Sequence, residues 1–76
     1  MSLEDAKEGK ILRILKFNAG RNAVLRMNAH GIYEGSEIKI IKNAPFRGPV
    51  MIENVKTGGR IMIGRGIARK IEVDLE

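Results

Sequence analysis

The sequence predicts a mostly β fold: a small, curled sheet of about five short strands, with one helix between the first and second strands. The chain has 76 residues, enough for one small domain. Short apolar runs are separated by glycine turns, and one stretch changes from helical spacing to strict alternation. Because a core of this size is barely sufficient, a nearly closed sheet with the helix over its open end fits the pattern best.

The helix that precedes the second strand is expected to run through His30. Its apolar positions fall at helical spacing and form a narrow stripe made of Val24, Leu25 and Ala29. Either Asn18 or Asn22 is placed to cap its start. Arg21 is electrostatically unfavourable near a helix start, so the sequence leaves the first residue of the helix open.

Two glycines are expected to turn the chain from the helix into the second strand. Gly31 stands where a helix end favours a left-handed residue, and Ile32 is placed to fold back onto Met27. Gly35 makes a second tight bend. From Ser36 the period becomes two, with Ile38 and Ile40 on one face and Glu37 and Lys39 on the other, which predicts a half-buried strand over Ser36–Lys42.

The first strand is predicted over Lys10–Phe17, although part of this run also matches helical spacing. Apolar residues occur at both odd and even positions of this run, which point to opposite faces of a strand. We therefore expect both faces to be covered, one by the barrel interior and one by the helix. The two expected faces consist of Ile11, Leu15 and Phe17, and of Leu12 and Ile14.

The remaining elements follow from alternation and turn residues. A loop over Asn43–Pro49 contains two prolines and Gly48, so Pro49 should lead into the next strand rather than lie within it. The later elements are expected to be a strand over Val50–Val55, a glycine hairpin turn over Lys56–Gly59, a strand over Arg60–Ile63, a helical turn over Ile67–Lys70 and a strand over Ile71–Leu75.

Composition limits the classes of function. The chain has no cysteine and a net charge of +5, and residues 1–8 are expected to be a polar arm that leads into the first strand of one domain spanning 1–76. A basic surface can bind nucleic acid, an acidic protein or an anionic membrane, or serve solubility alone. Base stacking needs aromatic side chains, and only Phe17, Tyr33 and Phe46 supply them, so nucleic acid is the less favoured partner.

Catalytic and metal-binding residues are scarce in the sequence. No serine or threonine is next to the only histidine. The acidic residues of the predicted strands, Glu37, Glu53, Glu72 and Asp74, alternate with apolar ones as solvent-facing residues do. An enzyme is therefore not expected. His30 is the only candidate metal ligand, and a closed site takes about four ligands. It could hold a weak site or one shared between two copies; the alternative is a histidine that stabilises the helix end when protonated.

A partner surface is expected around the helix end and the proline loop. Its candidate members are Arg26, Tyr33, Phe46 and Arg47. Arginine and tyrosine are enriched at interface hot spots, and phenylalanine is common in interfaces. The alternative is that the basic residues form a solvated face with no partner.

Four motifs, in order along the chain, make it resemble the FeoA family of ferrous iron transport proteins. They are the strand start at Gly9–Ile11; Arg26-Met27 followed by Gly31-Ile32, Gly35 and Ile38; Pro45 with Gly48-Pro49; and Arg65, Ala68, Ile71 and Val73. The sequence departs from the usual family pattern at His30, Glu34, Gly64 and Ile67.

The resemblance implies an SH3-like barrel and a non-enzymatic accessory role in ferrous iron uptake. It implies contact with the cytosolic GTP-binding part of a membrane iron transporter, and thus a cytoplasmic location that includes the inner face of the membrane. A weakly bound divalent transition metal and a homodimer are compatible with it. Similar domains occur at the C-terminus of repressors of the diphtheria toxin repressor type, so a stand-alone regulatory domain is an alternative, as is a small RNA- or DNA-binding barrel.

Overall fold

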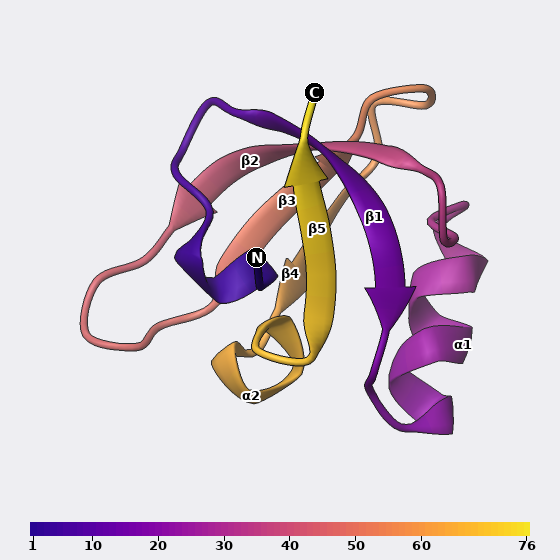
Figure 1. Ribbon diagram of the computed structural model, residues 1–76, viewed down its shortest axis with the longest axis horizontal. Coiled ribbons are helices and arrows are strands. Elements are labelled where there is room, and N and C mark those ends of the chain that lie inside the picture. Colours follow the sequence, from indigo (N-terminus) through magenta and orange to yellow (C-terminus); the bar gives the residue numbers. More distant parts are fainter.

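A computed structural model describes residues 1–76 and contains one five-stranded antiparallel sheet with the strand order β4-β3-β2-β1-β5 (Figure 1). Its elements are η1 (Leu3–Asp5), β1 (Ile11–Phe17), α1 (Arg21–Ala29), β2 (Glu37–Asn43), β3 (Val50–Asn54), β4 (Arg60–Ile63), α2 (Arg65–Ala68) and β5 (Ile71–Leu75). The predicted mostly β class, with the main helix between the first two strands, is confirmed. The short 3-10 helix η1 is additional, whereas α2 corresponds to the helical turn predicted before the last strand.

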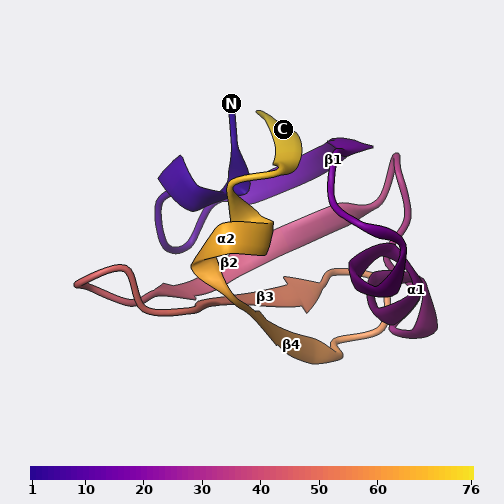
Figure 2. The same ribbon diagram turned by 90° about the horizontal axis from the view of Figure 1, so that it is seen from below.

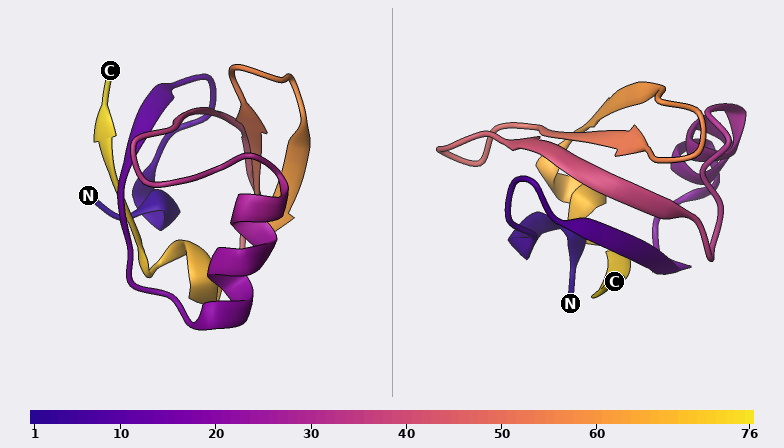
Figure 3. Two further views of the ribbon diagram at one scale, coloured as in Figure 1. Left: turned by 90° about the vertical axis from the view of Figure 1, so that its right-hand side faces the viewer. Right: turned by 90° about the horizontal axis from the view of Figure 1, so that it is seen from above.

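The sheet curls around a single apolar interior, with α1 at one end of the barrel (Figures 2 and 3). The inward-facing residues of all five strands form the core, and Leu12, Ile38, Ile52 and Val73 among them are fully buried. Register shifts interrupt the β1–β5 pairing at Leu15 and the β2–β3 pairing at Ile41. An extra residue of this kind bends a strand and increases its twist, so the two bulges help a short sheet to close.

The bulge at Leu15 changes which face of β1 each residue occupies. Leu12 and Ile14 point inward, but after the bulge Phe17 pairs with Ile71 and packs against the core. The expected grouping of Phe17 with Ile11 and Leu15 is therefore wrong. The expectation that both faces of this strand are covered is also wrong, because Ile11 is 41% exposed and Leu15 47% exposed.

The first eight residues do more than lead into β1. Leu3 is fully buried and Ala6 is nearly so, and both belong to the core. The Met1 carbonyl accepts a hydrogen bond from the Val73 N–H at 2.8 Å, and Ser2 pairs with Glu72. The segment thus covers part of the outer edge of β5, an exposed strand edge of the kind that otherwise invites unwanted pairing.

Helix α1 begins without a side-chain cap. Gly20 is its N-cap residue, so the expected capping by Asn18 or Asn22 is wrong. The apolar stripe also differs from the expected one, because Met27 is the buried residue and Leu25 is 52% exposed. A nine-residue helix with no cap is marginal alone, so its stability depends on packing at the barrel end.

No helix here has the length and apolar character needed to span a bilayer.

The end of α1 is a Schellman motif held by a buried asparagine. The Ile32 N–H donates to the Met27 carbonyl at 3.0 Å and the Gly31 N–H to the Asn28 carbonyl at 2.9 Å, with Gly31 at φ +74°. Ile32 is fully buried. From β3, the Asn54 Nδ2 donates to the His30 carbonyl at 3.1 Å and to the Gly31 carbonyl at 3.3 Å. This contact fixes the helix end to the sheet.

The second helical turn lies earlier than expected. It was predicted over Ile67–Lys70, whereas α2 spans Arg65–Ala68 with Gly64 as its N-cap residue. Its Ala68 is fully buried, which leaves room for only a small side chain where α2 meets the core. The helix joins β4 to β5 across the bottom of the barrel in Figure 1.

Substitution Gly31→Ala is expected to lower the free energy of unfolding by about 1–2 kcal/mol, because a left-handed conformation is costly for alanine. The added Cβ would also lie 3.1 Å from the Asn54 Nδ2. Urea unfolding measures the effect. Gly66→Ala is the matched control, since Gly66 has no positive φ and open space around its Cβ position. An unchanged unfolding midpoint for Gly31→Ala would contradict the account.

Candidate functional site

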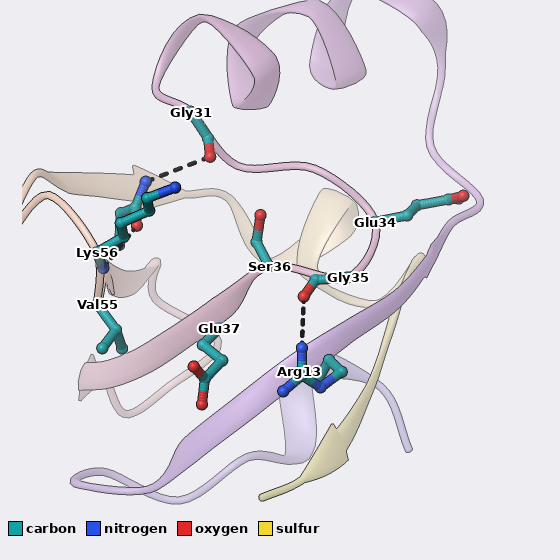
Figure 4. Close-up of a pocket in the computed structure, with 9 residues that line it drawn as sticks. Arg13, Gly31, Glu34, Gly35, Ser36, Glu37, Val55 and Lys56 are labelled. Carbon is teal, nitrogen blue, oxygen red and sulfur yellow. Dashed lines mark hydrogen bonds between the residues drawn. The ribbon is translucent and has the colours of Figure 1, made fainter.

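A polar cleft of about 550 Å³ lies between the α1–β2 connection and the end of β3 (Figure 4). It is lined by Arg13, Gly31, Glu34, Gly35, Ser36, Glu37, Asn54, Val55 and Lys56. Figure 4 shows the Arg13 guanidinium reaching across to the Gly35 carbonyl, a contact of 2.7 Å. Only one lining residue is hydrophobic, whereas small-molecule sites are mostly apolar.

Most polar groups of this cleft are engaged within the protein. Arg13 also pairs with Glu76 at 2.5 Å, and Glu34 accepts a hydrogen bond from the Phe17 N–H. The Ser36 hydroxyl accepts one from the Tyr33 N–H. These contacts hold the connection after α1 in place, so we interpret the cleft as structural.

The predicted metal ligand lies at the end of α1. His30 is its C-cap residue and is exposed. The structure contains no group of three or more His, Cys, Asp or Glu side chains that could hold a metal ion. The histidine's one interaction with the sheet uses its backbone carbonyl, which accepts from Asn54.

The loop between β2 and β3, residues 44–49, has an unusual tip. Phe46 and Arg47 have φ values of +57° and +60°, and no other non-glycine residue in the chain has a positive φ. The Gly48 N–H donates to the Pro45 carbonyl at 3.1 Å, which closes a four-residue turn. The Phe46 side chain is 100% exposed. We call this segment the Phe46 loop.

Arg65, at the start of α2, holds the base of the Phe46 loop. Its Nη1 donates to the Glu4 carbonyl at 3.1 Å, and its Nη2 donates to the Asn43 Oδ1 at 2.8 Å and to the Ala44 carbonyl at 2.9 Å. The Asn43 Nδ2 donates in turn to the carbonyls of Glu4 and Ala6. One guanidinium therefore joins η1, β2 and α2. We call this set of hydrogen bonds the clamp.

The bulge at Ile41 makes this clamp geometrically feasible. After the bulge, Asn43 pairs with the buried Val50, so its partly buried side chain turns toward Arg65. Without the extra residue the alternation would place position 43 on the outer face, as it does for Lys39.

Beside the clamp is a hollow of about 330 Å³ with charges of both signs. Its lining includes Glu4, Asp5, Arg47 and Arg69. Arg69 and Glu4 form an ion pair at 3.1 Å, whereas Arg47 makes no hydrogen bond or ion pair. The hollow thus leaves one free cation next to the exposed ring of Phe46.

The four residues predicted to form one partner surface lie in two places. Tyr33 lines a shallow hollow with side chains of β1 and α1, and Arg26 of α1 donates to the Met62 carbonyl at 2.7 Å. Phe46 and Arg47 lie in the loop at the opposite end of the molecule from α1 (Figures 1 and 2). The structure therefore does not bring the two pairs together.

Most of the arginines have structural partners. Five of the seven do: Arg13, Arg26 and Arg65 donate to backbone carbonyls. Arg13, Arg60 and Arg69 pair with glutamates. Continuous single-sign charge is what drives phosphate binding. Arginines engaged in this way do not favour a nucleic-acid interface.

Sequence reasoning missed two of the residues that hold the site. Asn54 reads as the polar member of an alternating strand, yet it is only 4% exposed. Asn43 was expected in the loop rather than at the end of β2. A polar residue at a strand end is an ambiguous signal, because its partners here come from segments at least 20 residues away. Arg65 was singled out only through the family resemblance.

Comparison with known proteins identifies the family. Residues 1–75 match the model of the FeoA domain. The chain belongs to the FeoA family. A protein of Methanocaldococcus jannaschii named as an Fe(2+) transport protein A is 44% identical over 69 residues, covering 91% of this chain and 79% of that protein. The FeoA role as an accessory in ferrous iron transport thus applies to this chain.

Solved structures share the barrel. The FeoA protein from Chlorobium tepidum superposes with a TM-score of 0.88 at 23% identity, covering 99% of this chain and 70% of that one. An iron uptake regulatory protein, also FeoA, gives 0.81 at 26% identity, covering 96% and 93%. The manganese regulator SloR gives 0.81 at 17% identity, covering 100% and 34%, a likeness of fold alone. The predicted SH3-like barrel is confirmed.

Substitution Arg65→Lys is expected to release the Phe46 loop, because one ammonium cannot span the three acceptors that the guanidinium fork reaches. We expect the free energy of unfolding to fall by about 1–3 kcal/mol. Faster hydrogen exchange should appear at the Gly48 and Ala44 N–H groups. Arg21→Lys is the control, since Arg21 is the first residue of α1 and its side chain is in none of the three ion pairs and donates no hydrogen bond. Equal exchange rates in the two variants would show that Arg65 is not the clamp.

Proposed function

We propose that this FeoA protein is a non-enzymatic docking module that acts on the cytosolic GTP-binding part of a membrane ferrous-iron transporter. Its family role in iron transport supports the proposal, and so does the character of its cleft. Most of the polar groups in that cleft are engaged in internal contacts, whereas catalysis needs convergent acid, base or nucleophilic groups with free atoms.

The observation that carries the proposal is the position of the aromatic residues. Of the three in the chain, only Phe17 packs against the core; Tyr33 is 53% exposed and Phe46 is 100% exposed. Aromatic side chains supply the largest apolar area a small core can bury. A 76-residue protein that leaves the Phe46 ring fully outside its core offers that ring for burial against another molecule.

This proposal places the protein in the cytoplasm, at the inner face of the membrane when it is bound to the transporter. Metal binding is not required for docking. A metal at His30 would need ligands from a second molecule, since closed sites take about four ligands and no acidic or histidine cluster surrounds it. A site shared between two copies therefore stays a prediction.

A strain that lacks this protein is expected to take up ferrous iron more slowly, and a plasmid copy should restore the rate. The protein should also co-purify with the full transporter solubilised in detergent. The measurement is the initial rate of radioactive iron uptake, with transporter abundance determined in each strain as the control. A full uptake rate at equal transporter abundance in the deletion strain would overturn the proposal.

A further inference from the structure

The Phe46 loop holds a strained conformation from which the Phe46 side chain gains no packing contact. A left-handed backbone costs a non-glycine residue about 1–2 kcal/mol, and Phe46 and Arg47 adopt it consecutively. The Phe46 ring is fully exposed, so it makes no packing contact that offsets this cost. Backbone strain that the surrounding structure holds in place clusters at binding and active sites.

The surrounding residues keep the tip in this one conformation. The Ala44 N–H donates to the Pro49 carbonyl at 3.2 Å, and the Ala44 carbonyl accepts from Arg65. Gly48 lies so close to Ala44 that a Cβ there would approach the Ala44 Cβ to 2.8 Å. A tip that is already ordered loses little conformational entropy on binding, which raises affinity for a given contact area.

The charges beside the tip favour a protein partner over a lipid surface. Attraction to anionic lipid requires a cluster of basic residues. Here the free cation Arg47 is next to Asp5 and to the Glu4–Arg69 pair, and Glu8 accepts from the Asn43 N–H at 3.0 Å. An exposed aromatic ring within a mixed-charge rim is the composition of an interface hot spot.

We propose that Phe46 is the anchor of the docking interface: its ring inserts into an apolar pocket on the transporter's cytosolic part, and Arg47 pairs with an acidic side chain at the rim of that pocket. This inference rests on the proposed function. It assigns the contact to the β2–β3 end of the barrel, away from α1 and Tyr33. Arg65 is then a positioning residue that acts through the loop.

The test compares Phe46→Ala with Tyr33→Ala, which removes the other exposed aromatic ring. Binding to the detergent-solubilised transporter is measured for the full chain and both variants. Phe46→Ala should weaken binding at least about 30-fold, as for a hot-spot aromatic, and Tyr33→Ala less than about threefold. Because the ring makes no internal contact, the melting temperature of Phe46→Ala should match that of the unsubstituted protein.

The outcomes separate the two proposals. If the unsubstituted protein does not bind the transporter, the proposed function fails and the anchor fails with it. If it binds and Phe46→Ala binds equally well, or Tyr33→Ala is the weaker binder, only the anchor is overturned. Co-sedimentation with phosphatidylglycerol vesicles that is lost in Phe46→Ala, with transporter binding intact, would assign the ring to the membrane instead.

Discussion

The side chain of Arg65 is the contact on which the arrangement of the functional end depends. It comes from α2 late in the chain, yet it binds the Glu4 carbonyl near the N-terminus and both the side chain of Asn43 and the carbonyl of Ala44. Hydrogen bonds from a charged donor are among the stronger ones in proteins, so this side chain can keep a strained loop in place.

The opposite end of the barrel is held by the same physical means. There the Asn54 side chain donates to the carbonyls of His30 and Gly31, which directly follow the last residue of α1, and so fixes α1 to β3. In both cases one largely enclosed polar side chain satisfies carbonyls that secondary structure leaves free. A barrel with an apolar core of 15 buried residues thus has its irregular ends defined by hydrogen bonds. The rigid scaffold that results can present exposed loops to a partner.

The sequence predicts what depends on near neighbours. The alternation of Ile38 and Ile40 identifies a strand, and a glycine followed by an apolar residue identifies the helix end, because both are local effects. The bulges at Leu15 and Ile41 carry no such signal, since they depend on the pairing of distant strands. They are why Phe17 was assigned to the wrong face and the orientation of Asn43 was missed. The separation of Arg26 and Tyr33 from Phe46 and Arg47 likewise follows from the topology of the sheet, which the local sequence pattern does not specify.

Backbone amide shifts of isotopically labelled protein, recorded as the transporter's cytosolic part is added, test the central claim most directly. If a preorganised loop at the β2–β3 end makes the contact, large shift changes are expected at Phe46, Arg47 and Gly48, with the residues from Ile32 to Ser36 nearly unchanged. Changes concentrated at the end of α1 and the connection that follows it, with the β2–β3 loop unaffected, would contradict it.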